Sequence, residues 1–141
     1  MKTMIKTFAK KADLGKIIDF WKQTGVFYEP EDKIEILEKL IEYDKQAIHL
    51  IKEWENILAS AVLIYHPFQS FIYRVSVNKN IRWEWIWTKL LSFIESTLKE
   101  RWMLHPTIFV EEWNELAIKF YENNWWENLY KVHCLVKNLE N

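Results

Sequence analysis

Glycine is almost absent from this sequence. Average usage predicts about 10 glycines in a chain of this length, whereas this chain of 141 residues has 2. Tryptophan, ordinarily one of the rarest residues, occurs 9 times, so the excess of Trp nearly equals the deficit of Gly. Backbone positions with positive φ normally depend on glycine. Two explanations follow: either several Trp stand where Gly belongs, or the chain has a Trp-rich core or binding surface.

Cysteine and long apolar runs are also scarce. The single cysteine, Cys134, excludes an internal disulfide framework. It lies in the apolar run Leu129–Val136, which predicts a buried position in a strand rather than a reactive thiol. No apolar run approaches the length of a membrane span, and the first residues lack the apolar core of a signal peptide. We therefore expect a cytoplasmic protein without a membrane partner.

Neither sign of charge is in excess. The net charge is −1, and Lys and Glu are mixed along the chain, which gives no electrostatic footprint for nucleic acid. His49, His105 and His133 have no ligand-like spacing and are expected to be surface or strand residues, so no metal site is expected. Half of the residues are hydrophobic and 28% are charged. That balance predicts a single globular domain spanning residues 1–141.

Hydrophobic periodicity predicts four helices and six strands. The helices are expected at residues 13–24, with Asp13 as N-cap and Thr24-Gly25 as the end, and at Asp32–Tyr43, Ile86–Arg101 and Asn114–Asn124. The strands are expected at Met4–Ala9, Ala47–Lys52, Ile57–His66, Phe68–Val77, Thr107–Val110 and Leu129–Val136. The three consecutive strands in the middle are joined by tight turns, which predicts an antiparallel meander.

One stretch of the sequence has the pattern of an anion-binding site. Residues 80–92 read N-I-R-W-E-W-I-W-T-K-L-L-S and follow the strand that ends at Val77. A strand, a polar turn with a cation and then an amphipathic helix is an arrangement that directs backbone N–H groups at an anion such as phosphate. Close approach of the backbone to phosphate requires residues without side chains. Positions 83, 85 and 87, which should be smallest, are all Trp.

With Gly at these three positions the stretch resembles the acetyl-CoA pyrophosphate loop of the GNAT superfamily of N-acetyltransferases. That family has Gln or Arg, two residues, Gly, one residue, then Gly or Ala, and Arg82, position 85 and position 87 match this spacing. Lys99–Trp102 and Trp113–Trp126 are also similar to GNAT segments once Trp102, Trp113 and Trp125 are replaced by Gly. The resemblance covers the whole chain.

These substitutions suggest a decoding hypothesis. Seven Trp stand where turn chemistry or the family pattern requires Gly, at positions 54, 83, 85, 87, 102, 113 and 125. Trp21 and Trp126 are expected to be genuine aromatic residues. We hypothesise that the gene uses UGA for Gly and that the sequence was read with a table in which UGA encodes Trp.

The resemblance implies a GNAT fold of the α/β (α+β) class. Its central mixed, mostly antiparallel sheet is flanked by helices in the order β-α-α-β-β-β-α-β-α-β. It further implies an acetyl-CoA-dependent N-acetyltransferase that is a monomer or a homodimer. The acceptor is a primary amine, on a small molecule, a lysine or a protein N-terminus. The alternative is a catalytically silent GNAT-like module that binds CoA or a protein partner.

The resemblance also implies the site residues. Acetyl-CoA is expected to contact Val75, Ser76, Val77, Arg82, Trp83, Glu84, Trp85, Ile86, Trp87, Thr88, Asn114 and Tyr121. Tyr121 is the expected acid for the CoA thiolate, with a partly buried helix aromatic as the alternative. Tyr28, Glu29 and Tyr73 are expected to line the acceptor groove. The general base stays open among Glu29, His66, a water-mediated base and none at all.

Overall fold

The structure, a computed structural model, describes residues 3–81 and 83–140. Their elements are β1 (Met4–Phe8), the 3-10 helix η1 (Lys11–Asp13), α1 (Leu14–Thr24), α2 (Ile34–Tyr43), β2 (Ile48–Glu53), β3 (Asn56–Ile64), β4 (Phe71–Val77), α3 (Trp83–Glu100), β5 (Thr107–Ile108) and α4 (Glu115–Asn123). The chain divides into two compact units, Met1–Phe109 with the sheet and Val110–Asn141 with α4. A single domain over residues 1–141 stays a prediction.

The strands form one sheet in the order β1-β2-β3-β4-β5. Neighbouring strands are antiparallel from β1 to β4, whereas β4 and β5 are parallel. The turn between β2 and β3 is tight, because Glu53 and Asn56 pair with two residues between them. The predicted meander and the mixed, mostly antiparallel sheet are confirmed.

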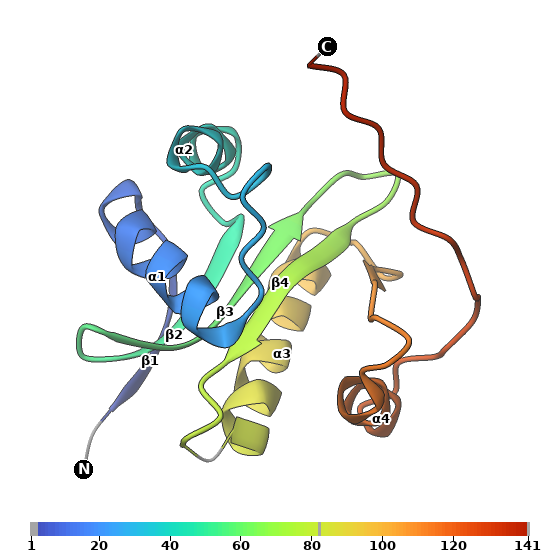
Figure 1. Ribbon diagram of the computed structural model, residues 1–141. Helices are drawn as coiled ribbons and strands as arrows, with labels where there is room; N and C mark the ends of the chain where they lie inside the picture. Colours follow the sequence, from blue (N-terminus) through green and yellow to red (C-terminus); the bar gives the residue numbers. More distant parts are fainter. Residues whose placement is uncertain (1–2, 82, 141) are drawn as a thin grey trace. The chain divides into compact units, whose positions relative to one another are not determined.

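Helices cover both faces of this sheet. In Figure 1, α1 and α2 lie over one face and α3 crosses the other. Successive side chains of β2 therefore point alternately toward the helices on one face and toward α3 on the other. Ile48 and Leu50 belong to the buried cluster shared with α1 and α2, whereas His49 between them bonds to Thr97 of α3.

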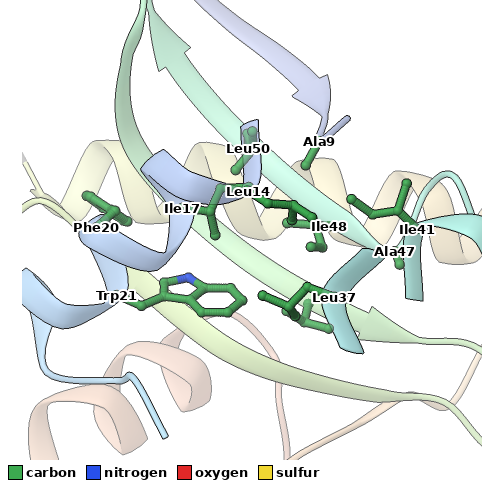
Figure 2. Close-up of a cluster of buried hydrophobic side chains, with 11 residues drawn as sticks. Ala9, Leu14, Ile17, Phe20, Trp21, Leu37, Ile41, Ala47, Ile48 and Leu50 are labelled. Carbon is green, nitrogen blue, oxygen red and sulfur yellow. The ribbon is translucent and has the colours of Figure 1, made fainter. Parts of the chain in front are cut away.

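Trp21 is at the centre of the core under α1 and α2. Figure 2 shows its indole among the side chains of α1, α2 and β2, and none of its surface is exposed. The predicted apolar stripe of α1 places it there, because Leu14, Ile17 and Trp21 recur at helical spacing and are all buried. Its Nε1–H donates to Ser60 Oγ at 2.8 Å, so the one polar atom of the indole is satisfied.

The boundaries of α1 agree with the sequence. Asp13 is its N-cap residue, although the Asp13 carboxylate accepts from the Lys10 N–H at 2.8 Å rather than from a helical N–H. Gly25 ends the helix with φ of 82°. A left-handed residue at this position is a common helix terminator, and glycine adopts it without strain.

Two helices begin elsewhere than predicted. α2 begins at Ile34 instead of Asp32, because the Asp32 carboxylate binds Arg74 and the Tyr28 N–H. α3 begins at Trp83, three residues before the predicted Ile86. Trp is an acceptable helix former, whereas Gly costs about 1 kcal/mol at a helical position. With Trp at positions 83 and 85, α3 therefore extends over a stretch that is a loop in the family pattern.

The predicted last strand is wrong. Residues 125–140 are neither helix nor strand, and β5 covers Thr107–Ile108 rather than Thr107–Val110. The apolar side chains of the expected strand are exposed, as is Cys134, which the sequence predicted to be buried. A strand needs a paired neighbour to fix its register. β5 has only 2 residues and offers few backbone groups for pairing. No helix in the described part of the chain is long and apolar enough to cross a membrane.

His49 is a buried titratable residue between the sheet and α3. Thr97 Oγ1 donates to the Phe93 carbonyl, so it accepts a hydrogen bond from His49 Nε2–H at 2.8 Å. Phe8 and Phe93 pack against the imidazole at ring-centroid distances of 5.0 and 4.5 Å. Burial, assisted by the charge of Arg101 and opposed by Asp44, lowers the pKa of His49 to about 4.

This burial predicts a loss of stability in mild acid. An unfolded His takes up its proton near pH 6.5, whereas folded His49 resists protonation until about pH 4. The unfolded state therefore binds more protons in this window, and the free energy of unfolding falls by about 3 kcal/mol from pH 6.5 to pH 4. Urea unfolding of the wild type and of His49→Phe at each pH measures the difference. Parallel curves for the two proteins would contradict the assignment.

Candidate functional site

β4 separates from β5 after only two residue pairs. β5 pairs with Phe71 and Ile72, whereas β3 continues to pair with β4 as far as Val77. On the β5 side, Val75–Val77 therefore pairs with no strand of the described residues. The backbone groups of such an edge can bind an extended amide chain by strand addition.

A β-bulge at Arg74 lies just beyond the point of separation. Ser60 pairs with Ser76 and Val62 with Tyr73, so β4 has one more residue than β3 in this interval. Arg74 has φ of 53°, in the left-handed region. A bulge bends its strand and increases its twist, which accounts for the departure of β4 from β5.

The Arg74 side chain connects this bulge to the loop between α1 and α2. Its Nε lies 2.9 and 3.2 Å from the two carboxylate oxygens of Asp32, and one terminal nitrogen donates to Glu31 at 2.8 Å. Asp32 is 4% exposed and also accepts from the Tyr28 N–H at 2.7 Å. The guanidinium lies 6.0 Å from the centre of the Tyr28 ring. Arg74 thus fixes the loop that carries Tyr28 and Glu29.

Replacing Arg74 with alanine is expected to lower the free energy of unfolding by about 3 kcal/mol, because the carboxylate of Asp32 is left buried without its cation. Urea unfolding measures this loss. Lys16→Ala is the matched control: its ion pair with Glu55 is solvent-exposed, and its removal should change stability by less than about 0.5 kcal/mol. Equal effects of the two substitutions would show that Arg74 does not hold the loop.

Arg74 was not predicted as a site residue. An arginine in a strand with alternating polarity gives no signal of a bulge or of positive φ. Of the acids in the 29–32 loop, only Glu29 was given a role, in the acceptor groove and as a candidate base. Their pairing with Arg74 joins residues 42 positions apart, which no local pattern shows.

Val75, Ser76 and Val77 lie at the end of β4, where the resemblance predicts them. Ser76 is almost fully buried, and its hydroxyl donates to Thr24 Oγ1 of α1. The side chains of Ser76 and Val77 are therefore buried, whereas that of Val75 is partly exposed. The contact of this segment with acetyl-CoA stays a prediction.

The predicted pyrophosphate loop is helical where the structure describes it. Trp83, Glu84, Trp85, Ile86, Trp87 and Thr88 form the first turns of α3, and Arg82 lies outside the described residues. Ile86 is fully buried and Trp85 is half exposed. The rings of Trp83 and Trp87 are 6.0 Å apart, and Lys89 lies 5.4 Å from the ring of Trp85.

The predicted acceptor residues divide between two neighbourhoods. Tyr28 and Glu29 lie in the loop that Arg74 fixes to β4, and both are exposed. Tyr73 packs with Phe71 and Phe109, at ring-centroid distances of 6.1 and 6.5 Å. Arg74, next to Tyr73 in β4, is the residue that links the two neighbourhoods.

The two predicted site residues of the C-terminal unit lie on α4. Asn114 caps this helix, with its side-chain oxygen accepting from the Ala117 N–H at 3.2 Å. Tyr121 is buried, with ring-centroid distances of 5.7 Å to Phe120 and 5.9 Å to Trp126. The roles of both residues toward a cofactor stay predictions.

The two side chains named as candidate bases both lie on the surface. His66 is exposed, and its Nδ1 accepts from the Phe68 N–H at 3.0 Å. Glu29 is exposed in its loop. Among residues 3–81 and 83–140 there is also no group of three His, Cys, Asp or Glu that could hold a metal ion.

Solved structures share this arrangement of strands and helices. The PaiA N-acetyltransferase from Thermoplasma acidophilum, in complex with coenzyme A, superposes with a TM-score of 0.75 over 86% of this chain and 88% of its own, at 17% identity. The chain has the GNAT fold. Ard1 from Thermoplasma volcanium (TM-score 0.74, 15% identity) and the ribosomal-protein-S18-alanine N-acetyltransferase from Escherichia coli (0.73, 13%) match over 86% of this chain and 80% and 76% of theirs. No protein-family model and no curated protein matches the sequence.

Each of the site segments now has a position in the GNAT fold. The resemblance assigns acetyl-CoA to the end of β4, to the start of α3, to Asn114, the N-cap of α4, and to Tyr121 of α4. It assigns the acceptor to the loop before α2 and to Tyr73 of β4. At identities of 13% to 17% the likeness establishes the fold. The chemistry of this chain must be argued from its own residues.

Proposed function

We propose that this protein is an acetyl-CoA-dependent N-acetyltransferase that transfers an acetyl group to a primary amine. The observation that supports it best is the separation of β4 from β5, which leaves the β5-facing edge of Val75–Val77 unpaired with any strand of the described residues. Pantetheine carries amide groups along an extended chain, and a free strand edge provides the complementary N–H and C=O groups.

The two ends of the expected cofactor site fit acetyl-CoA to different degrees. The backbone edge at Val75–Val77 requires no particular side chain and fits as it stands. The start of α3 has a helix N-terminus, which favours an anion, but Trp83, Trp85 and Trp87 place indoles where pyrophosphate needs close approach to the backbone. We therefore expect the chain with Gly at these positions to be the competent enzyme.

The reaction requires three contributions from the protein. A neutral amine attacks the thioester carbonyl carbon, the C–N bond forms and the C–S bond breaks. Backbone N–H groups of Val75–Val77 stabilise the oxyanion that develops on the carbonyl. Tyr121 donates its proton to the departing thiolate. The amine loses its proton to Glu29, to His66 or to water.

The acceptor is assigned to the loop that Arg74 holds. Tyr28 and Glu29 offer an aromatic face and a carboxylate, which suit a protonated amine as it approaches. A protein N-terminus, a lysine side chain and a small amine all meet this description.

Release of the CoA thiol tests the proposal. The chain with Gly at positions 54, 83, 85, 87, 102, 113 and 125 is incubated with acetyl-CoA and three acceptors: a peptide with a free N-terminus, an N-blocked peptide with one lysine, and a small diamine. Thiol release that depends on one of the acceptors supports the proposal. Acetyl-CoA binding without transfer to any of them would instead indicate a silent CoA-binding module.

A further inference from the structure

We propose that seven of the nine tryptophans are glycines in the protein that its own cells make, each encoded by UGA. The positions are 54, 83, 85, 87, 102, 113 and 125. Composition and resemblance first suggested these positions, and the backbone geometry supports positions 54, 102 and 125 independently. The inference does not depend on the proposed function.

Gly25 shows which backbone conformation is needed at a helix end of this chain. α1 ends at Gly25, which has φ of 82°, and the Val26 N–H donates to the Trp21 carbonyl at 3.0 Å. This left-handed termination, with a hydrogen bond that spans six residues, is the helix end at which glycine is preferred. A side chain at Gly25 would be strained there even though no atom lies within 4 Å of its Cβ position.

α3 ends in the same way, with Trp102 in the place of Gly25. The Met103 N–H donates to the Leu98 carbonyl at 2.9 Å, the Trp102 N–H donates to the Lys99 carbonyl at 3.1 Å, and Trp102 has φ of 60°. These two hydrogen bonds around a left-handed residue define the Schellman motif. Glycine is the usual residue at the position that Trp102 occupies.

α4 repeats the motif with Trp125. The Trp126 N–H donates to the Tyr121 carbonyl at 3.0 Å, the Trp125 N–H donates to the Glu122 carbonyl at 3.3 Å, and Trp125 has φ of 72°. Two of the proposed glycines therefore occupy the helix-terminating position that Gly25 occupies in α1. For a bulky residue this backbone conformation is a genuine outlier.

Trp54 also has positive φ, in the turn of the hairpin between β2 and β3. Glu53 and Asn56 are paired, so Trp54 and Glu55 are the two central residues of the turn. Trp54 has φ of 56°, whereas Glu55 is not among the residues with positive φ. Positive φ at the first central residue alone is typical of a type II′ turn, which takes glycine at that position.

High exposure distinguishes four of the seven residues from Trp21 and Trp126. Trp21 is fully buried and hydrogen-bonded, and Trp126 packs on Tyr121. By contrast, Trp54, Trp102, Trp113 and Trp125 are 74%, 86%, 74% and 94% exposed. An indole is a large apolar group that proteins normally bury to a high degree. These four side chains contribute little to packing, as expected if the positions evolved as glycine.

The remaining three positions lie in the first turns of α3. The buried stripe of this helix is formed by other residues, Ile86, Leu90, Leu91, Ile94, Thr97 and Leu98. Trp85 is half exposed. With glycine at 83, 85 and 87 the helix would lose propensity at its start, by about 1 kcal/mol at each helical position, and the stretch would return to the loop that the sequence pattern predicts.

The codons of the gene and the masses of peptides from the source cells test the inference together. UGA at the seven positions, UGG at positions 21 and 126, and peptides with the mass of glycine at the seven support it. UGG at any of the seven, or a source peptide with Trp there, overturns it.

A stability comparison tests the geometric argument separately. The triple variant Trp54→Gly, Trp102→Gly and Trp125→Gly relieves three left-handed residues, and its Tm is expected to rise by about 5–10 °C. Trp113→Gly is the matched control, because Trp113 is equally exposed but does not have positive φ. Its Tm should not rise. A triple variant no more stable than the original chain would overturn the argument from backbone strain.

Discussion

Replacing Trp21 with alanine is expected to lower the free energy of unfolding by about 3–5 kcal/mol. Trp21 is the largest fully buried side chain of the core, and its indole packs between α1, α2 and β2. The substitution leaves a cavity and removes the hydrogen bond to Ser60. A domain of ordinary stability has about 5–15 kcal/mol in total, so this single change would remove a large fraction of it.

Urea unfolding of Trp21→Ala measures this loss, and Trp113→Ala is the control. Trp113 is 74% exposed, so its replacement should change stability by less than about 0.5 kcal/mol. The pair also distinguishes a genuine tryptophan from a proposed glycine. Equal and small effects of both substitutions would contradict the packing of α1 on the sheet.

Replacing Tyr121 with phenylalanine is expected to lower kcat by about 100-fold to 10,000-fold, the usual range for loss of a general acid. The prediction rests on the proposed function. Phenylalanine keeps the ring contacts of Tyr121 with Phe120 and Trp126 and removes only the proton donor. The KM for acetyl-CoA should therefore change little, whereas the rate of thioester cleavage should fall.

Steady-state thiol release by the glycine chain, with and without Tyr121→Phe, measures this effect. Tyr130→Phe is the matched control, because Tyr130 belongs to the same unit and is 80% exposed. A kcat within about threefold of the parent would exclude Tyr121 as the acid and leave it as a buried aromatic residue of α4. A thioester with a more acidic thiol should also rescue the variant, since a better leaving group needs less protonation.

Periodicity predicted most of the fold because its elements bury one regular face. The stripe of Leu14, Ile17 and Trp21 set the position of α1, and the apolar runs of β2, β3 and β4 gave the meander. The segment Leu129–Val136 shows the limit of this reasoning. Its pattern is that of a strand, but a strand forms only with a partner, and sequence spacing does not provide one.

The candidate site was less predictable. The position of Val75–Val77 followed from the resemblance, but the bulge at Arg74 and its bonds to Asp32 depend on contacts between distant segments. The start of α3 was mispredicted for a different reason. The family pattern describes the backbone of a glycine-rich loop, and Trp83 and Trp85 give that backbone a preference for helix.

The most direct test of acetyl-CoA as the ligand is calorimetric titration of two chains, one as written and one with Gly at the seven positions. We predict that the glycine chain binds acetyl-CoA with a Kd in the range of about 1 μM to 1 mM that is usual for enzyme substrates. The chain as written should bind at least about 100-fold more weakly, because the indoles block the approach to the backbone. Binding by neither chain would contradict the proposed acetyltransferase function.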